Sequence, residues 1–390
     1  MKILIKNVNL SVSLSLTALR FVGFWSPEGL TETRRLLYNV YTGFSFMFLL
    51  GTYLIIQIVD LFNIWGNLPL MTGTAFVLFT NLAQAAKIAN LLSKKRRILN
   101  VINEANDVLG AETNGEGMEI VKRCNREMIF LQVVYLTLTL ITTTGWASSA
   151  EKGQLPLRAW YPYDTSKSPA YEITYLHQVG AINIAACLNV GKDTLVSALI
   201  AQCRCRLQLL GLSLRTLCRG LEMTDKLVYT PEQEAIAAER LRNCVKQHQA
   251  ALEAAKEIQS CFSAPTFFQF FVSLVIICVT AFQLISQTGN LVRLFSMGTY
   301  LLNMMFQVFI YCYQGHHLSE ESADVAGYAY KCPWYACSVR LRKMILVIMT
   351  RTRRVTKITA GGFTTLSLGS FMAIIKASYS LFTLLQQVTE

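Results

Sequence analysis

Histidine and cysteine residues near the C-terminal third are the first candidates for chemistry in this sequence. His316 and His317 precede Cys332 and Cys337, and imidazole and thiolate are ligands that zinc prefers. Their spacing matches no common zinc module, and the residues between the two cysteines include a proline and a tryptophan. The sequence therefore favours packing at a membrane interface over a metal site.

Recognisable catalytic motifs are not found. The sequence contains no GxSxG, P-loop, HExxH or paired-acid motif in an exposed context, so it predicts neither an enzyme nor a cofactor. Cys203 and Cys205 lie beside arginines and are compatible with palmitoylation, but buried or lipid-facing thiols are the favoured interpretation.

Three lysines fall inside apolar stretches, where an ionisable side chain indicates function unless its ammonium can reach the interface. Lys87 and Lys192 lie toward the ends of their stretches, so we expect both to extend to the membrane surface. Lys376 falls in the middle of the last stretch, which predicts a water-filled cavity or a carboxylate partner.

Polar and aromatic side chains share single faces of two apolar stretches at equal depth. The candidates are Thr72, Phe76 and Phe79 in the second stretch and Thr139, Thr142 and Trp146 in the third. Such stripes are commonly ordinary packing, and hydroxyls often bond their own backbone. Their coincidence at one depth nevertheless predicts a pocket for a small apolar ligand.

The elements that position these residues are membrane-spanning helices. Of the 390 residues 53% are hydrophobic and 15% charged, and long stretches contain no charged residue. Since about 20 apolar residues cross a bilayer, we expect an all-α membrane protein with seven spans. They are placed near 36–58, 68–92, 128–147, 173–198, 266–286, 291–313 and 362–386.

The distribution of basic residues predicts the orientation of these spans. Segments 1–35, 93–127, 201–264 and 316–361 hold 29 of the 36 lysines and arginines, whereas the alternate connections hold four. Because basic loops stay in the cytoplasm, we expect a cytoplasmic N-terminus and an extracellular C-terminus. The net charge of +12 then reflects loops facing anionic lipid, not a nucleic-acid surface.

Two helices outside the spans are also predicted. The apolar run from Val8 to Leu19 favours an amphipathic helix at the membrane surface, with candidate lipid-facing groups Leu14, Leu16, Phe21, Phe24 and Trp25. Thr230 and Gln233 form a capping box at the start of a second helix, whose seam of apolar residues could pack within the chain or against another subunit.

The last 80 residues carry specific motifs. Residues 312–322 read CYQGHHLSEES, 358–371 read ITAGGFTTLSLGSF, and 375–385 read IKASYSLFTLL. Together they resemble the insect odorant receptor family, and in particular its variable, ligand-tuning subunits. Gustatory receptors have five residues between a Thr-Tyr pair and Gln-Phe, whereas six separate Tyr379 from Gln386 here.

The resemblance implies an odorant-gated, non-selective cation channel, formed as a heterotetramer with the odorant co-receptor in the plasma membrane of olfactory sensory neurons. A small volatile organic ligand would bind among the outer halves of spans two to six. The resemblance adds five further ligand-binding candidates, namely Ala181, Ile184, Thr299, Tyr300 and Asn303.

The same resemblance assigns the pore and the subunit contacts. The last span would line the pore, with Phe382, Leu385 and Glu390 near its outer mouth. The subunit anchor would include Tyr330, Trp334 and Tyr335. We therefore expect regions at 1–200 (spans one to four), 201–264 (cytoplasmic helical anchor), 265–361 (spans five and six with the inner part of helix seven) and 362–390 (pore-lining span). The alternatives are a gustatory-type channel and, from another class, a secondary transporter, which would show internal repeats.

Overall fold

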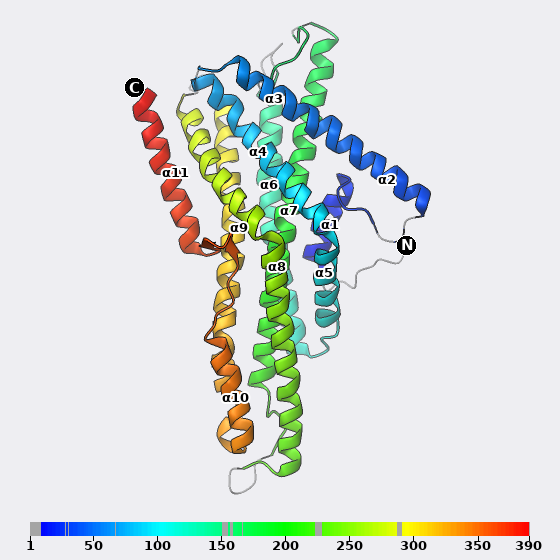
Figure 1. Ribbon diagram of the computed structural model, residues 1–390, viewed down its shortest axis with the longest axis vertical. Helices are drawn as coiled ribbons and strands as arrows, with labels where there is room; N and C mark the ends of the chain where they lie inside the picture. Colours follow the sequence, from blue (N-terminus) through cyan, green and yellow to red (C-terminus); the bar gives the residue numbers. More distant parts are fainter. Residues whose placement is uncertain are drawn as a thin grey trace.

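The computed structural model describes residues 9–27, 29, 31–66, 68–149, 155–156, 159–165, 167–222, 228–286 and 291–389. These residues form a helical bundle with one two-stranded sheet (Figure 1). In chain order the elements are α1 (Leu10–Phe21), α2 (Glu32–Phe44), the π-helical η2 (Ser45–Gly51), α3 (Thr52–Asn63), α4 (Leu68–Ser93), α5 (Lys95–Gly110), α6 (Gly115–Ser148), α7 (Ala170–Arg215), α8 (Pro231–Ser286), α9 (Leu291–Tyr330), the 3₁₀ turn η3 (Trp334–Ala336), α10 (Val339–Thr352), β1 (Thr359–Ala360), β2 (Thr364–Thr365) and α11 (Leu368–Thr389).

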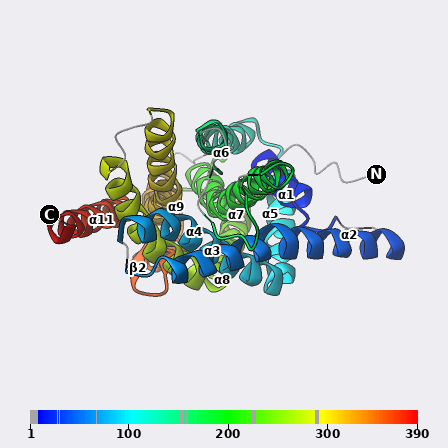
Figure 2. The same cartoon turned by 90° about the horizontal axis from the view of Figure 1, so that it is seen from above.

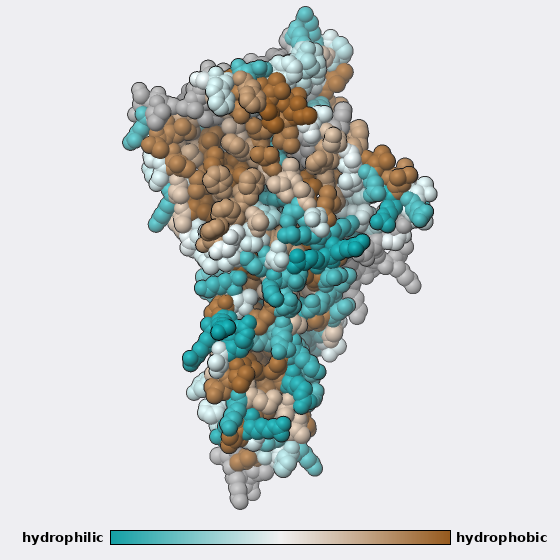
Figure 3. Space-filling model, viewed as in Figure 1, coloured by the Kyte–Doolittle hydropathy of each residue, from teal (hydrophilic) through white to brown (hydrophobic). Residues whose placement is uncertain are grey.

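The molecule has two halves of different polarity. Figure 3 shows apolar residues gathered over one half and hydrophilic residues over much of the other. We call the half that contains α2, α3, α4 and α11 the membrane half, and the half that contains α5 and α10 the polar half. Helices α7, α8 and α9, of 46, 56 and 40 residues, run through both (Figure 1).

The first six predicted spans lie within helices, and the seventh does so from Leu368 onward. Within the described residues, six helical segments are long and apolar enough to cross a membrane, and the first of them joins α2, η2 and α3. Helix α4, with 26 residues, coincides with the second predicted span. The long fourth helix, expected to end near residue 215, does so as α7.

The last span starts later than predicted. Its helix begins at Leu368 instead of residue 362, because the preceding residues form the β1–β2 hairpin, in which Thr359 pairs with Thr365. Gly361 and Gly362 make the turn with φ angles of 61° and 79°, which residues other than glycine rarely adopt. The TAGG motif is therefore a hairpin turn and not the start of a helix.

Helix α8 continues through Pro265 without a break. A proline inside a helix leaves the carbonyl four residues earlier without its helical donor. Here that carbonyl belongs to Cys261, and it accepts from Nδ2 of Asn90 (3.0 Å), near the inner end of α4, and from Nζ of Lys94 (3.2 Å), the residue that follows α4. These side chains replace the missing hydrogen bond and tie α4 to the middle of α8.

The predicted membrane-facing position of the N-terminal helix is wrong for three of its five candidate side chains, whereas Leu14 and Phe21 are exposed, at 45% and 75%. Helix α1 packs against α7, and Leu16, Phe24 and Trp25 are almost fully buried. Gly191 permits the close approach, since a Cβ atom there would lie 3.3 Å from side chains of α1. The hydroxyl of Ser15 also shares a hydrogen bond of 2.9 Å with that of Thr194, so this helix is part of the bundle.

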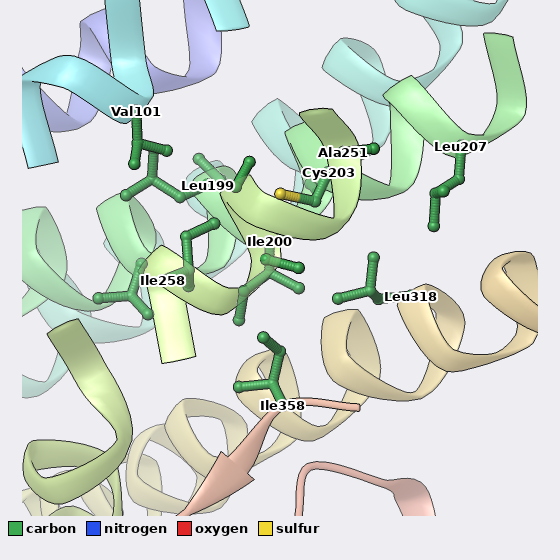
Figure 4. Close-up of a cluster of buried hydrophobic side chains, with 14 of the residues drawn as sticks. Val101, Leu199, Ile200, Cys203, Leu207, Ala251, Ile258, Leu318 and Ile358 are labelled. Carbon is green, nitrogen blue, oxygen red and sulfur yellow. The ribbon is translucent and has the colours of Figure 1, made fainter. Parts of the chain in front are cut away.

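The start of α8 confirms the predicted capping box. The backbone N–H of Thr230 donates to Oε1 of Gln233 (3.2 Å), and the N–H of Gln233 donates to the Thr230 hydroxyl (3.4 Å). The apolar seam that follows is buried within the chain, as Leu241 and Ala255 show. Figure 4 shows Ala251 and Ile258 of α8 in one cluster with residues of α7 and α9 and with Ile358, which precedes β1, so this face of α8 contributes to the core of its own subunit.

Candidate functional site

A cavity in the membrane half is the candidate ligand site. It lies among α3, α4, α6, α7 and α9 and has a volume of about 70 Å³, several times the roughly 10–15 Å³ that one water needs. Its lining residues are Tyr53, Val77, Thr80, Asn81, Gln84, Thr139, Thr142, Thr143, Trp146, Ala181, Ile182, Ala185, Ala186, Asn189, Tyr300, Asn303 and Met304. The wall is mainly apolar, with a limited set of polar groups, as in sites that bind small organic molecules.

An aromatic pair forms one side of the cavity. The rings of Trp146 and Tyr300 lie 4.9 Å apart at an angle of 43°. Their helices approach closely because Gly145 faces Ser296, whose Cβ would lie 3.1 Å from any Cβ at position 145. The hydroxyl of Tyr300 is held by that of Thr80, 2.7 Å away. The two rings therefore offer a fixed aromatic surface to a ligand.

The threonine hydroxyls in the cavity wall are already engaged. Thr139 donates to the carbonyl oxygen of Tyr135 (2.8 Å) and lies 3.3 Å from Oδ1 of Asn303. Thr142 donates to the carbonyl oxygen of Leu138 (2.8 Å) and lies 3.4 Å from the hydroxyl of Thr299. These contacts stabilise α6 against α9 and leave the two hydroxyls little capacity for a ligand.

A buried carboxylate lies one helical turn from the cavity, toward the polar half. Asp193 of α7 is fully buried, and Nζ of Lys87 on α4 lies 2.6 Å from Oδ1. The same carboxylate accepts hydrogen bonds from the hydroxyls of Tyr311 (2.8 Å) and Tyr135 (3.2 Å) and from Nε2 of Gln307. One side chain thus joins four helices, and we call these five residues the Asp193 cluster.

The Asp193 cluster is connected to the cavity wall. Asn189 lines the cavity and donates to the hydroxyl of Tyr135 at 3.2 Å. Nζ of Lys192 lies 3.4 Å from the backbone oxygen of Gln84, another wall residue. Lys87 and Lys192 are 7% and 3% exposed, so the prediction that their ammonium groups reach the membrane surface is wrong. The carboxylate of Asp193, four residues after the wall residue Asn189, compensates the positive charge of Lys87 and so allows its burial.

Comparison with known proteins decides the family. The sequence model of the 7tm odorant receptor family matches residues 67–379, which is most of the chain. The chain belongs to the insect odorant receptor family. Odorant receptor Or1 of Anopheles gambiae is 25% identical to this receptor over 395 aligned residues, covering 96% of this chain and 94% of that one. Odorant receptor 63a of Drosophila melanogaster is 30% identical over 241 residues, covering 60% and 55%.

Solved structures agree with this receptor's fold. The olfactory receptor OR5 of Machilis hrabei in complex with eugenol superposes with a TM-score of 0.84 and covers 98% of this chain and 99% of that one, at 18% identity. OR5 without a named ligand gives a TM-score of 0.81. This receptor is therefore a multi-pass helical membrane protein of a receptor family, not an enzyme, and the gustatory and transporter alternatives are set aside.

Six of the predicted ligand-binding residues line the cavity of this receptor. They are Thr139, Thr142, Trp146, Ala181, Tyr300 and Asn303. Thr299 and Phe79 lie beside it, through the Thr142 hydroxyl and the surrounding apolar cluster respectively. Ile184 instead packs against the larger core that contains α1. The side chains of Thr72 and Phe76 are outside the described residues.

The cavity also contains residues that the sequence did not single out. Tyr53, Gln84 and Asn189 line it, and each is almost fully buried. Asp193 was not among the predicted residues, whereas its basic neighbour Lys192 was. A usable signal existed, since an acidic residue next to a lysine inside an apolar stretch indicates a buried ion pair.

The remaining predicted residues lie away from the cavity. Phe382 and Leu385 are on α11, and Glu390 is outside the described residues. Tyr330 at the end of α9 and Tyr335 in η3 are exposed, and the Trp334 ring lies 5.9 and 6.2 Å from their rings. Cys203 and Cys205 are buried, which disfavours palmitoylation. No cluster of three or more metal-ligating side chains occurs in the described part of the chain.

Proposed function

We propose that this chain is the ligand-tuning subunit of an odorant-gated, non-selective cation channel. It would assemble with the odorant co-receptor into a heterotetramer in the plasma membrane of olfactory sensory neurons. In this proposal the cavity binds a small volatile organic molecule, α11 lines a central pore, and the polar half lies in the cytoplasm, as the distribution of basic residues predicts.

The observation that carries the proposal is the isolation of α11. In its most apolar stretch only 6% of the residues are buried within the chain, compared with 72% for α7. Figures 1 and 2 show it standing at the edge of the bundle, away from α6 and α7. An exposed helix that carries both apolar side chains and Lys376 fits a place between lipid, neighbouring subunits and a wet pore. Phe382, Leu385 and Glu390 are the proposed residues of its mouth.

An exposed apolar groove in the polar half supports the same assembly. An apolar groove of about 280 Å³ is lined by Tyr330, Trp334, Arg342, Ile345, Leu346 and Met349. Tyr335, Val339 and Val347 beside it are more than half exposed. A patch of this kind on a polar surface marks a protein interface. We assign Tyr330, Trp334 and Tyr335 to contacts with neighbouring subunits.

The cavity is the proposed odorant site, with Trp146 and Tyr300 as its principal contacts. The OR5 structure named above carries eugenol, a small aromatic odorant, which supports a ligand of this size class. The proposed site keeps the predicted residues Thr72, Phe76, Phe79, Ala181, Ile184 and Asn303 as candidates and adds those found only in the structure. A ligand larger than the present cavity would require side chains to move.

Recording of odorant-evoked current tests the proposal. Cells that express this chain with a co-receptor subunit should respond to some members of a volatile panel, and cells that express either alone should not respond to the same members. Trp146→Ala should raise the half-maximal concentration about ten-fold or more, because it removes aromatic contact area. Trp65→Ala, which truncates a side chain 73% exposed near the α3–α4 turn, is the matched control. Equal effects of the two substitutions would contradict the cavity assignment.

A further inference from the structure

Two polar atoms in the cavity wall lack a partner. The hydroxyl of Tyr53 and Oε1 of Gln84 are buried and make no hydrogen bond within the described part of the chain. Their residues are 3% and 2% exposed, so solvent outside the protein does not reach them. A buried polar group without a partner is costly, and one that borders a cavity indicates where a ligand can bind.

The two atoms belong to neighbouring helices that line the same cavity. Helices α3 and α4 are antiparallel and joined twice, by Thr74 donating to Asp60 (2.8 Å) and by Asn81 donating to Gln57 (3.1 Å). One further turn toward the polar half brings Tyr53 on α3 and Gln84 on α4 to one level. Both residues line the same cavity, so they form a polar floor for it.

The hydrogen-bonding capacity of this floor is specific. A carbonyl oxygen such as Oε1 of Gln84 only accepts, whereas the hydroxyl of Tyr53 can donate and accept. The amide nitrogen of Gln84 is already engaged with the backbone oxygen of Ala185. A ligand that satisfies both free atoms must therefore donate to Gln84, and it can either accept from Tyr53 or donate to it.

The opposite part of the cavity suits a hydrocarbon. Val77, Ile182 and Met304 line it together with the Trp146–Tyr300 pair, and the threonine hydroxyls in its wall are bonded to their own helix. The cavity is thus polar at the floor and apolar toward the aromatic pair.

We propose that this receptor selects small alcohols or phenols, whose hydroxyl donates to Gln84 and accepts from Tyr53 while the hydrocarbon part contacts Trp146 and Tyr300. This inference rests on the proposed function, because it assigns the chemical class of ligand to the same cavity. An ether, ketone or hydrocarbon of equal size cannot donate to Gln84, so its binding leaves that oxygen unpaired.

Isomeric ligands isolate the effect of the hydroxyl. 1-Hexanol and pentyl methyl ether contain the same atoms, as do benzyl alcohol and anisole, and only the alcohols can donate a hydrogen bond. In the complete channel, expressed with its co-receptor, we expect each alcohol to activate at a concentration about ten-fold lower than its isomer, the usual effect of one buried hydrogen bond. A ratio near one, or no response to either alcohol up to its solubility limit, would overturn the inference.

Two substitutions locate that preference in the cavity floor. Tyr53→Phe keeps the ring and removes a donor from which alcohol and ether both accept, so it should fold normally, weaken both isomers alike and leave the alcohol-to-ether ratio unchanged. Gln84→Leu removes the oxygen to which only the alcohols donate, so it should reduce the alcohol-to-ether ratio several-fold; if it fails to reach the surface, Gln84→Met, which keeps the length of the side chain, decides. Thr143→Val removes a hydroxyl from the same wall, but that hydroxyl already donates to the carbonyl oxygen of Leu140 (3.2 Å), so the ratio should stay as in the unmodified receptor.

The Trp146→Ala variant separates failure of this inference from failure of the site. If Trp146→Ala weakens every agonist but substitution of Gln84 leaves the alcohol-to-ether ratio unchanged, the cavity binds odorants without recognising their hydroxyl. If neither substitution changes any dose–response curve, the cavity is not the odorant site.

Discussion

Replacing Lys87 with methionine removes the ammonium that lies 2.6 Å from the carboxylate of Asp193. Both residues are buried, at 7% and fully, and Asp193 keeps its negative charge among four helices after the substitution. Breaking a buried ion pair by removing one partner costs roughly 3–5 kcal/mol, since the other charge is left uncompensated. That is a large part of a typical stability of about 5–15 kcal/mol.

Lys192 supplies a matched control on the same structural level. It is also buried, but its ammonium makes only one long described contact, 3.4 Å from the backbone oxygen of Gln84. Lys192→Met removes a second positive charge near Lys87, so we expect it to be neutral or stabilising. The two substitutions are chemically identical and differ only in whether the lysine is paired.

Thermal unfolding of the detergent-solubilised complex measures the difference. With an unfolding entropy of about 2.1 cal/mol/K per residue, a loss of 3–5 kcal/mol lowers Tm by about 4–6 °C for a chain of this length. Lys87→Met should show this decrease, and Lys192→Met should not. Asp193→Asn should resemble Lys87→Met, and the double variant of Lys87 and Asp193 should lose less than the sum of the two. Equal Tm values for the two lysine variants would refute the ion-pair argument.

Three further predictions concern orientation, gating and packing. An epitope placed after Glu390 should stain on intact cells, and one placed before Met1 only after permeabilisation; the reverse would contradict the predicted topology. Phe382→Ala should raise the basal current of the heteromeric channel, because a narrow apolar ring closes a wet pore, and an unchanged current would remove this residue from the gate. Gly315→Ala should reduce current per surface receptor, since its Cβ would lie 2.7 Å from the backbone oxygen of Leu366; Gly327→Ala on the same helix, with open space around it, is the control.

Much of the fold could be predicted because lipid imposes a simple rule on sequence. The charge-free stretches predict every span, and the capping box at Thr230 predicts the start of α8. Local patterns could not predict that Asn90 and Lys94 bridge the gap at Pro265, since that depends on residues 170 positions away. The same limit explains α1, whose amphipathic pattern is equally suited to lipid and to the face of α7.

The site was predicted in part for a similar reason. The stripe of Thr139, Thr142 and Trp146 lies on one helical face, and that face does border the cavity. Tyr53 and Gln84 were missed because neither belongs to a local pattern. Their importance comes from a property that no sequence window contains, namely which polar atoms remain without a partner after the helices have packed.

The uninterrupted course of α8 through Pro265 has a mechanical consequence. The helix from Pro265 to Ser286 is about 32 Å long at 1.5 Å per residue, and a proline is where a helix bends most readily. A tilt of 5° at that residue moves the far end by about 3 Å, while the part before it stays fixed in the core of the polar half. Asn90 and Lys94, which donate to the Cys261 carbonyl, lie at the residue where this bend would occur. Helix α4, which contributes to the cavity wall, is thereby connected to the bending point of α8. This point lies close to the β1–β2 hairpin, where the N–H of Gly361 donates to the carbonyl of Ser263.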